Sequence, residues 1–235
     1  APPGHKGSGQ AAGVSFSIPR NALEYWQDRA RQAAVTQLEL RSRFDQTFLT
    51  IMDPDGLEVE LSATAPPDRD PSIVSLNSAT IVESDPGRSG KFLADVLGCA
   101  LAARKDGRSR FMLMDPSNTG IDIIAAPGTE RAKLSRGMVH HIAFRVADEA
   151  AQNQWRERLI AAGVHVTRVI DRQYFRSIYF REPGGVLFEI ATDGPGFLID
   201  EDADALGTSL KLPPWLEPIR ESIERRLPVV EFGSQ

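Results

Sequence analysis

The hydrophobic positions of this chain follow two periods in turn, and their order predicts three rounds of the same elements. Apolar residues at every second position predict strands, whereas apolar residues three and four apart predict helices. The first round predicts a strand, a helix and three strands, at residues 12–18, 22–35, 37–44, 47–52 and 57–63. Proline and charged residues at 65–71 then predict a linker, after which the pattern restarts.

The second and third rounds repeat this order of elements. The second predicts a strand at 73–82, a helix from Asp85-Pro86 to about Gly98, and strands at 111–114 and 121–125. The third predicts a strand at 139–146, a helix at 148–162, and strands at 164–170, 177–181 and 186–191. A terminal helix is predicted at 213–227, starting at a Pro-Pro pair. Self-similarity of this length indicates a repeated strand-helix-three-strand unit.

Alternation in the third round selects an imidazole and a carboxylate. Neighbouring side chains of a strand point to opposite faces. The faces suited to cover by a helix consist of Ile142, Phe144 and Val146 in one strand, and of Val186, Phe188 and Ile190 in the other. By this alternation His140 lies with the covered face, whereas His141 and Glu189 each point away from it. The pattern predicts that an open metal site lies on this second face.

The other two rounds carry incomplete copies of this pair. When the rounds are superposed on their glycines, the first has Glu60 at the carboxylate position and Gly13 at the imidazole position. The second has Asn77 or Ser78 at the imidazole position and Ile124 at the carboxylate position. Glu60 is therefore expected to be a relic of a lost site or a strand glutamate in solvent.

Composition narrows the class of protein. The chain has 235 residues, enough for one large or two ordinary domains, with 41% hydrophobic and 25% charged residues. A formal net charge of -5 and scattered basic residues argue against a nucleic-acid partner. No apolar run approaches the roughly 18 residues that span a membrane. The single cysteine, Cys99, excludes an internal disulfide framework and suits a reducing, cytoplasmic location.

Two motifs of the third round carry a family resemblance. His-His-Ile-Ala-Phe-Arg-Val starts at His140, and Tyr-Phe-Arg-Glu-Pro-Gly-Gly-Val-Leu-Phe-Glu-Ile starts at Tyr179. Together with the repeats, they resemble the vicinal oxygen chelate superfamily, which contains glyoxalase I, bleomycin-resistance proteins and type I extradiol dioxygenases. Residues 182–197 and the acidic segment after them are most similar to the ring-cleaving dioxygenases that act on hydroquinones.

The resemblance implies an α+β fold of repeated βαβββ modules that form cupped mixed sheets with helices outside. Three of an expected four modules are visible, and the fourth is expected to precede Ala1, where the chain lacks an initiating methionine. The implied division is a remaining module of an N-terminal glyoxalase-like domain, a linker, a C-terminal glyoxalase-like domain of two modules, and an acidic loop with a C-terminal helix. These parts correspond to residues 1–64, 65–72, 73–197 and 198–235.

The resemblance also implies the chemistry of the site. His141 and Glu189 would bind the metal with a second histidine from the absent module, which is the facial set of non-haem Fe(II) oxygenases. The expected metal is Fe(II), with Mn(II) as an alternative, and the expected partners are a small hydroquinone or catechol-type aromatic and O₂. The Tyr179 hydroxyl would hydrogen-bond the substrate, Arg172 would favour its ionised oxygen, and His140 would act beside the ligand. Structural roles remain open for Tyr179 as a core aromatic, for His141 as a core histidine and for Arg172 as a surface residue. A ligand role also remains open for His140.

Two rival functions fit the same repeats. A glyoxalase-like isomerase or lyase would use Zn²⁺ or Ni²⁺, although such sites usually contain two glutamates and the third round offers one. A metal-free binding protein of the bleomycin-resistance type would need neither residue as a ligand. Assembly into a homo-oligomer is compatible with each of these functions.

Overall fold

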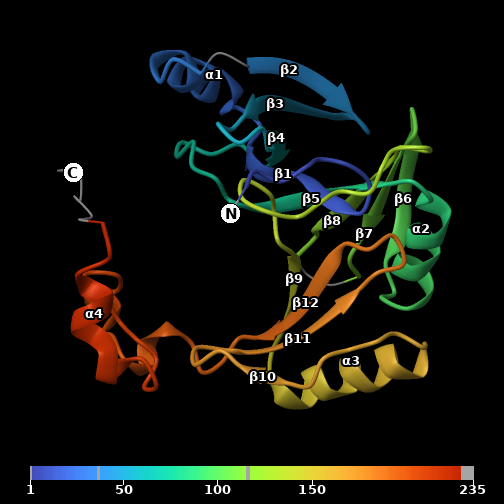
Figure 1. Ribbon diagram of the computed structural model, residues 1–235. Helices are drawn as coiled ribbons and strands as arrows, with labels where there is room; N and C mark the ends of the chain where they lie inside the picture. The colour runs from blue at the N-terminus through green and yellow to red at the C-terminus, as the bar shows by residue number, and fades with distance from the viewer. Residues whose placement is uncertain (1, 36–37, 115–116, 229–235) are drawn as a thin grey trace.

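A computed structural model of the chain describes residues 2–35, 38–114 and 117–228, so a few positions of the predicted strands, turns and tail lie outside it. The strands form one eight-stranded and one four-stranded sheet, and the chain ends in a separate helical segment (Figure 1). This arrangement confirms an α+β fold built from three βαβββ modules. Among the described residues, no helix has the length and apolar character needed to cross a membrane.

The first two modules share the eight-stranded sheet, whose order is β2-β3-β4-β1-β5-β8-β7-β6. The first module consists of β1 (Gln10–Pro19), α1 (Leu23–Gln32), β2 (Leu38–Arg43), β3 (Gln46–Met52) and β4 (Glu58–Ala65). The second consists of β5 (Ser75–Glu83), α2 (Pro86–Asp95), β6 (Ala100–Lys105), β7 (Arg108–Met112) and β8 (Gly120–Ala125). Within each module the first and last strands pair in parallel, and β1 and β5 join the modules antiparallel.

The third module forms the four-stranded sheet alone, with the order β10-β11-β12-β9. Its elements are β9 (Ile142–Val146), α3 (Glu149–Ala161), β10 (Ile170–Asp171), β11 (Arg176–Arg181) and β12 (Leu187–Thr192). Strand β9 is parallel to β12 and lies at the edge of the sheet.

Strand pairing groups the modules differently from the predicted unit of residues 73–197. The second module pairs with the first, because the long strands β1 and β5 run side by side over most of their lengths. The five-residue β9 pairs with β12 alone among the described strands. The predicted domain boundaries stay a prediction, but the sheets do not unite the second and third modules.

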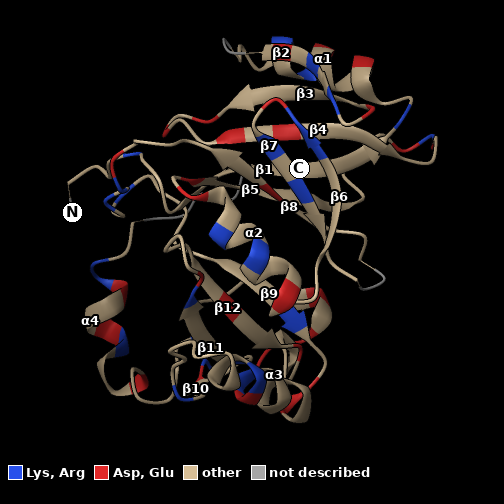
Figure 2. Cartoon of the chain, turned by 90° about the vertical axis from the view of Figure 1, so that its right-hand side faces the viewer, with Lys and Arg blue, Asp and Glu red and all other residues tan. Residues whose placement is uncertain are grey.

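One apolar core joins the two sheets. It contains Phe92 and Leu93 of α2, Leu159 of α3, and residues of both sheets such as Ile123 and Phe180. The rings of Phe92 and Phe180 lie 6.2 Å apart between centroids, and Figure 2 shows α2 between the two sheets. Burial of these side chains stabilises the packing of the sheets by roughly 25 cal/mol per Å² of apolar surface removed from water.

An aspartate caps the start of each of two helices. The side chain of Asp85 accepts a hydrogen bond from the Arg88 amide at the start of α2, and Asp148 does the same for the Ala151 amide at the start of α3. Both carboxylates satisfy backbone donors that a helix start leaves unpaired. Gly163 follows α3 with φ of 77°, a conformation that favours glycine.

The structure corrects the sequence prediction at three elements, of which one was missed and two were predicted wrongly. Strand β6 was missed because it is an edge strand with no buried residue, so its apolar positions do not alternate. The strand predicted at 164–170 is reduced to an isolated bridge from Val166 to Phe180 and to the two residues of β10. The terminal helix predicted at 213–227 is mostly absent, since Pro218 lacks the amide that a helix interior needs. A short 3-10 turn, Glu217–Ile219, and α4, Arg220–Glu224, stand in its place.

Candidate metal centre

The open face of the four-stranded sheet carries the predicted site. Helix α3 packs on the other face, where Phe188 and Ile190 are buried. On the open face, Glu189 of β12 pairs with Tyr179 of β11 on one side and with Ala143 of β9 on the other. The two faces of the strands therefore separate as the alternation predicts.

The two predicted ligands meet on this face. The Nε2 atom of His141 lies 2.6 Å from Oε2 of Glu189. The side chain of Glu189 is 4% exposed and that of His141 is 31% exposed. A buried carboxylate is costly without a partner, so the contact with the imidazole stabilises the position of Glu189.

Ser177 is a site residue that the sequence reasoning did not select. Its hydroxyl donates a hydrogen bond to Oε1 of Glu189, and the residue is fully buried. The signal for it was its position two residues before Tyr179 on the same strand, hence on the same face. Ser177 holds one carboxylate oxygen of Glu189 and leaves the other to face His141. A hydrogen bond of this kind orients a metal ligand without touching the metal itself.

The prediction that His140 lies with the covered face is wrong. The residue is exposed, and its Nδ1 atom lies 2.9 Å from Nδ1 of His141. Alternation fails here because β9 begins only at Ile142. A partner at Nδ1 determines the tautomer and ring orientation of an imidazole, so His140 is placed to direct the Nε2 atom of His141 toward Glu189.

Tyr179 and Arg172 extend the contacts on the other side of His141. The rings of His141 and Tyr179 have centroids 5.7 Å apart in an edge-to-face arrangement. Nη2 of Arg172 donates a hydrogen bond of 3.3 Å to the Tyr179 hydroxyl, and its guanidinium lies 5.5 Å from the centre of the Tyr179 ring. All five residues selected from the sequence thus form one continuous chain of contacts.

The donor chemistry of the site fits part of a divalent metal site. An imidazole nitrogen and a carboxylate oxygen in contact are two of the three donors of a facial set. The part of the chain that the structure describes contains no cluster of three or more His, Cys, Asp or Glu side chains suited to a metal. His141 and Glu189 therefore fit two positions of such a site, and its third donor is not among the described residues.

A cavity of about 540 Å³ borders the site at Tyr179. It extends from Tyr179, Arg181 and Leu187 toward α2 and the loop after α3. His141 and Glu189 are not among its lining residues, so the pair lies on the sheet face rather than inside this cavity. His165 lines the cavity and is exposed.

Comparison with known proteins identifies the family. The sequence model of the Glyoxalase/Bleomycin resistance protein/Dioxygenase superfamily matches residues 75–190. MhqO of Bacillus subtilis, which carries the name of a ring-cleaving dioxygenase, is 32% identical over 231 residues, covering 94% of this chain and 73% of MhqO. The chain belongs to this superfamily. The alignment with MhqO extends the superfamily relationship beyond residues 75–190 to nearly the whole chain.

Two further proteins support the assignment to this superfamily. The chlorohydroquinone/hydroquinone 1,2-dioxygenase of Sphingobium indicum is 31% identical over 244 residues, covering 95% of this chain and 74% of that protein. A crystal structure described as a dioxygenase from Bacillus subtilis superposes with a TM-score of 0.90 at 32% identity, covering 97% of this chain and 76% of that one. The superposition supports the module architecture described above.

Proposed function

We propose that the protein is a metal-dependent ring-cleaving dioxygenase that acts on a hydroquinone or catechol-type aromatic. The observation that carries the proposal is the contact of His141 Nε2 with Glu189 Oε2 on the open sheet face. Support comes from two relatives that align with nearly the whole chain, one named as a ring-cleaving dioxygenase and the other as a chlorohydroquinone/hydroquinone 1,2-dioxygenase.

Fe(II) is the metal that we infer, with Mn(II) as the alternative, and the cleavage is of the extradiol type. His141 and Glu189 would hold the ion, and a second histidine from the fourth module that the family resemblance implies would complete the facial set. A bound Fe(II) supplies the one-electron chemistry that O₂ needs in order to react with an aromatic ring.

The remaining residues of the site would bind and orient the substrate. The Tyr179 hydroxyl accepts a hydrogen bond from Arg172, so its own proton is available to a substrate oxygen. The Arg172 guanidinium favours the ionised form of a phenolic hydroxyl near it. His140 and Ser177 contact the two ligands rather than the substrate, and they hold the imidazole and the carboxylate in place.

The test is oxygen uptake by the full-length protein, which includes the module proposed to carry the second histidine, after it is loaded with Fe(II) under anaerobic conditions and then mixed with hydroquinone and O₂. We expect stoichiometric uptake and a yellow ring-opened product, both lost in His141→Ala and in Glu189→Gln. His5→Ala, which removes an exposed histidine far from β11 and β12 in the sequence, is the matched control and should retain activity.

Two other outcomes would contradict the proposal. Turnover of a methylglyoxal-thiol adduct by the Zn²⁺- or Ni²⁺-loaded protein, without oxygen uptake, would indicate a glyoxalase-like isomerase or lyase. Binding of the aromatic that is unaffected by His141→Ala and is followed by no turnover would indicate a metal-free binding protein. Sedimentation of the same sample would test the predicted homo-oligomer.

A further inference from the structure

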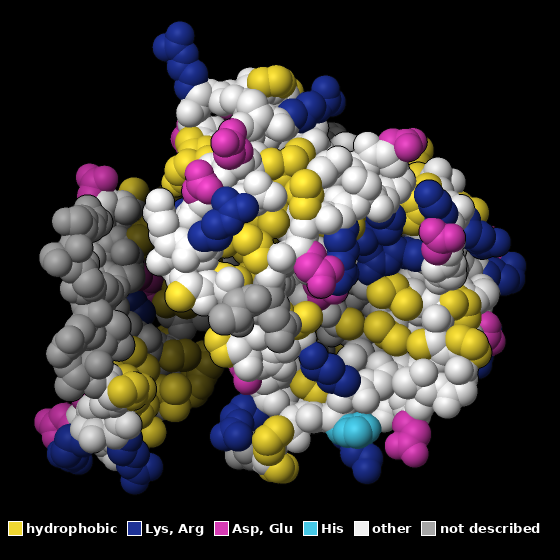
Figure 3. Space-filling view, turned by 90° about the horizontal axis from the view of Figure 1, so that it is seen from above, with side chains coloured by type: hydrophobic (Ala, Val, Ile, Leu, Met, Phe, Trp, Pro, Cys, Tyr) yellow, Lys and Arg dark blue, Asp and Glu magenta, His cyan; other side chains and the backbone are white. Residues whose placement is uncertain are grey.

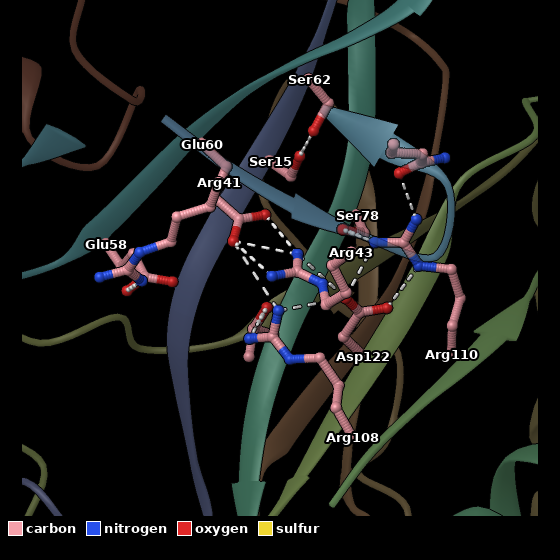
Figure 4. A network of polar contacts seen from close by, with 12 residues as sticks. Ser15, Arg41, Arg43, Glu58, Glu60, Ser62, Ser78, Arg108, Arg110 and Asp122 are labelled. Carbon is pink, nitrogen blue, oxygen red and sulfur yellow. Dashed lines mark hydrogen bonds and ion pairs between the residues drawn. The ribbon is translucent and has the colours of Figure 1, made fainter. Parts of the chain in front are cut away.

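The eight-stranded sheet carries a second cluster of polar side chains, on a different sheet from the proposed metal site. It consists of three arginines and two acids, namely Arg43 of β2, Glu60 of β4, Arg108 and Arg110 of β7, and Asp122 of β8 (Figure 4). Their side chains are between 0% and 17% exposed. In Figure 2 the acidic positions of β4 and the basic positions of β7 lie on the same sheet.

Four of these side chains form two balanced ion pairs. Arg43 donates to both carboxylate oxygens of Glu60, at 3.0 and 2.7 Å. Arg110 donates to both oxygens of Asp122, at 2.6 and 2.9 Å. Two-pronged contacts of this kind are the strong form of an ion pair. Both carboxylates are therefore already neutralised by a guanidinium of their own.

Arg108 is the surplus cation of the cluster. Its Nη1 atom is 3.7 Å from Glu60 and 3.6 Å from Asp122, and the atom is buried without a hydrogen-bond partner among the described residues. Burial, together with the neighbouring positive charge of Arg43, lowers the pKa of Arg108. Both acids are beyond hydrogen-bond distance of Nη1, and Nη2 donates to the Thr80 hydroxyl at 3.5 Å. A buried charge is costly unless it is fully hydrogen-bonded, so an anion beside Arg108 would stabilise the cluster.

A cavity of about 220 Å³ opens beside Arg108. Its lining residues are Arg41, Ser42, Arg43, Phe48, Lys105, Asp106 and Arg108. Four of these are cations and one is an acid, whereas the carboxylates of Glu60 and Asp122 lie outside the lining. In the view from above, Lys and Arg side chains gather in a hollow of the surface (Figure 3). Arg43 and Arg41 are paired with Glu60 and Glu39 outside the lining. The net positive charge of the wall therefore comes from Arg108 and Lys105, which Asp106 opposes.

We propose that this cavity is a binding site for a small oxyanion, a carboxylate or a phosphate, received by Arg108 with Arg43, Arg41 and Lys105 around it. The planar guanidinium matches the geometry of both anions. Ser42 adds a hydroxyl donor at the wall, and Asp106 is the one lining group that opposes an anion. The site uses neither His141 nor Glu189, so its existence does not depend on the dioxygenase proposal.

The test is calorimetric titration of the full chain with inorganic phosphate and, separately, with benzoate, at constant ionic strength. We expect saturable binding of at least one of them, and the tighter of the two identifies the class of anion. Arg108→Gln should abolish binding. Lys105→Gln should weaken it about fivefold and Asp106→Asn should strengthen it about fivefold, because each changes one charge at the mouth.

Lys105 and Asp106 are exposed, so these two variants are expected to fold even if Arg108→Gln does not. Lys91→Gln, which removes an exposed lysine outside the cavity, is the matched control and should leave the affinity unchanged. Absence of saturable binding of both anions would overturn the proposal. The same holds if Lys105→Gln and Asp106→Asn change the affinity in the same direction or no more than Lys91→Gln does.

Discussion

The two sheets place a carboxylate at the same position of every module but give it different partners. Strand register shows the equivalence: Glu189 lies opposite Ala143, Glu60 opposite Ser15, and Asp122 opposite Thr80. In the four-stranded sheet the carboxylate contacts an imidazole, and in the eight-stranded sheet each carboxylate is held by an arginine fork. An acid can therefore be buried at this position with either an imidazole or a guanidinium as its partner.

The first strand of each module determines whether its carboxylate meets an imidazole. The relevant position lies two residues before the residue that pairs with the carboxylate, which is Ala143, Ser15 or Thr80. His141 stands there in the third module, Gly13 in the first and Ser78 in the second. Only the third module has a metal-binding side chain at that point. Where the imidazole is absent, the carboxylate is neutralised by Arg43 or Arg110 from another strand, which leaves no donor for a metal.

This comparison corrects two predictions about the incomplete copies. Glu60 is not in solvent, since only 2% of the residue is exposed. The carboxylate position of the second module is occupied by Asp122 rather than Ile124, because Asp122 is the residue opposite Thr80 in the strand register. Superposition on the glycines misplaced this position by two residues, which kept the face of the strand but missed the acid.

The largest expected effect comes from removing each carboxylate in turn. Glu189→Gln should lower oxygen uptake by more than about 100-fold, since even partners of metal ligands cost 10–100-fold, and should abolish Mn(II) binding measured by electron paramagnetic resonance. Glu60→Gln removes the equivalent acid of the other sheet and should leave Mn(II) binding intact. Equal loss of Mn(II) binding in both variants would refute the distinction between the two sheets.

The next effect concerns the arginine forks. Asp122→Asn should lower the free energy of unfolding by about 3–5 kcal/mol, because it leaves the guanidinium of Arg110 buried without its acid. Urea denaturation measures this loss. Glu39→Gln, which breaks an exposed pair with Arg41, is the control and should cost about 1 kcal/mol or less. Combining Arg110→Met with Asp122→Leu should recover most of the loss, and failure to do so would contradict a purely electrostatic cause.

Glu83 is a buried carboxylate that has no arginine fork, and it should make stability depend on pH. Burial, reinforced by neighbouring Glu182 and opposed by Arg131, raises the pKa of Glu83 to about 8 from an ordinary value of 4.5. The folded state thus holds a proton that the unfolded state has lost, so the free energy of unfolding should fall between pH 4.5 and 8. The expected fall is about 2–4 kcal/mol.

Thermal unfolding at a series of pH values measures this dependence. Glu83→Gln cannot ionise, so it should abolish most of the fall and melt at a higher temperature than the parent protein at pH 8.5. Glu24→Gln, at the start of α1, is the control and should keep the parent's dependence. A parent protein whose stability rises across the same window would show that the Glu83 proton is not held.

The smallest expected effect concerns the serine that orients Glu189. Ser177→Ala should weaken Mn(II) affinity by about 10–100-fold through loss of the outer contact, while the protein remains folded by circular dichroism. Ser15→Ala is the matched control, since Ser15 is a buried serine of the other sheet that bonds to Ser62. Unchanged affinity in Ser177→Ala would mean that His141 alone holds the carboxylate.

Local patterns predicted what lies within one module. Alternation identified the covered faces, and the pairing of His141 with Glu189 followed from two strands of one repeat. Asp85 and Asp148 marked the helix starts because a cap acts within one turn. The resemblance to a known superfamily supplied the roles of Tyr179 and Arg172, and the structure brings both side chains to His141.

What the sequence left open depends on contacts between modules. The pairing of β1 with β5 and the forks of Arg43 and Arg110 join residues that no local period relates. Strand β6 has an exposed, featureless pattern, and the helix predicted after residue 213 fails at Pro218. The number of charged residues likewise could not predict that Arg108 is buried, because its burial arises only when strands of two modules pack together.

The apolar core that α2 shares with both sheets has a consequence for how the protein responds to heat. The side chains beneath the imidazole-carboxylate pair and those beneath the second module belong to one contiguous cluster. Neither the second nor the third module can lose its packing without exposing part of the other's, so these two modules should melt in a single cooperative transition. An anion that occupies the arginine cavity would then raise the melting temperature seen by a probe at Tyr179, even though the two places share no side chain.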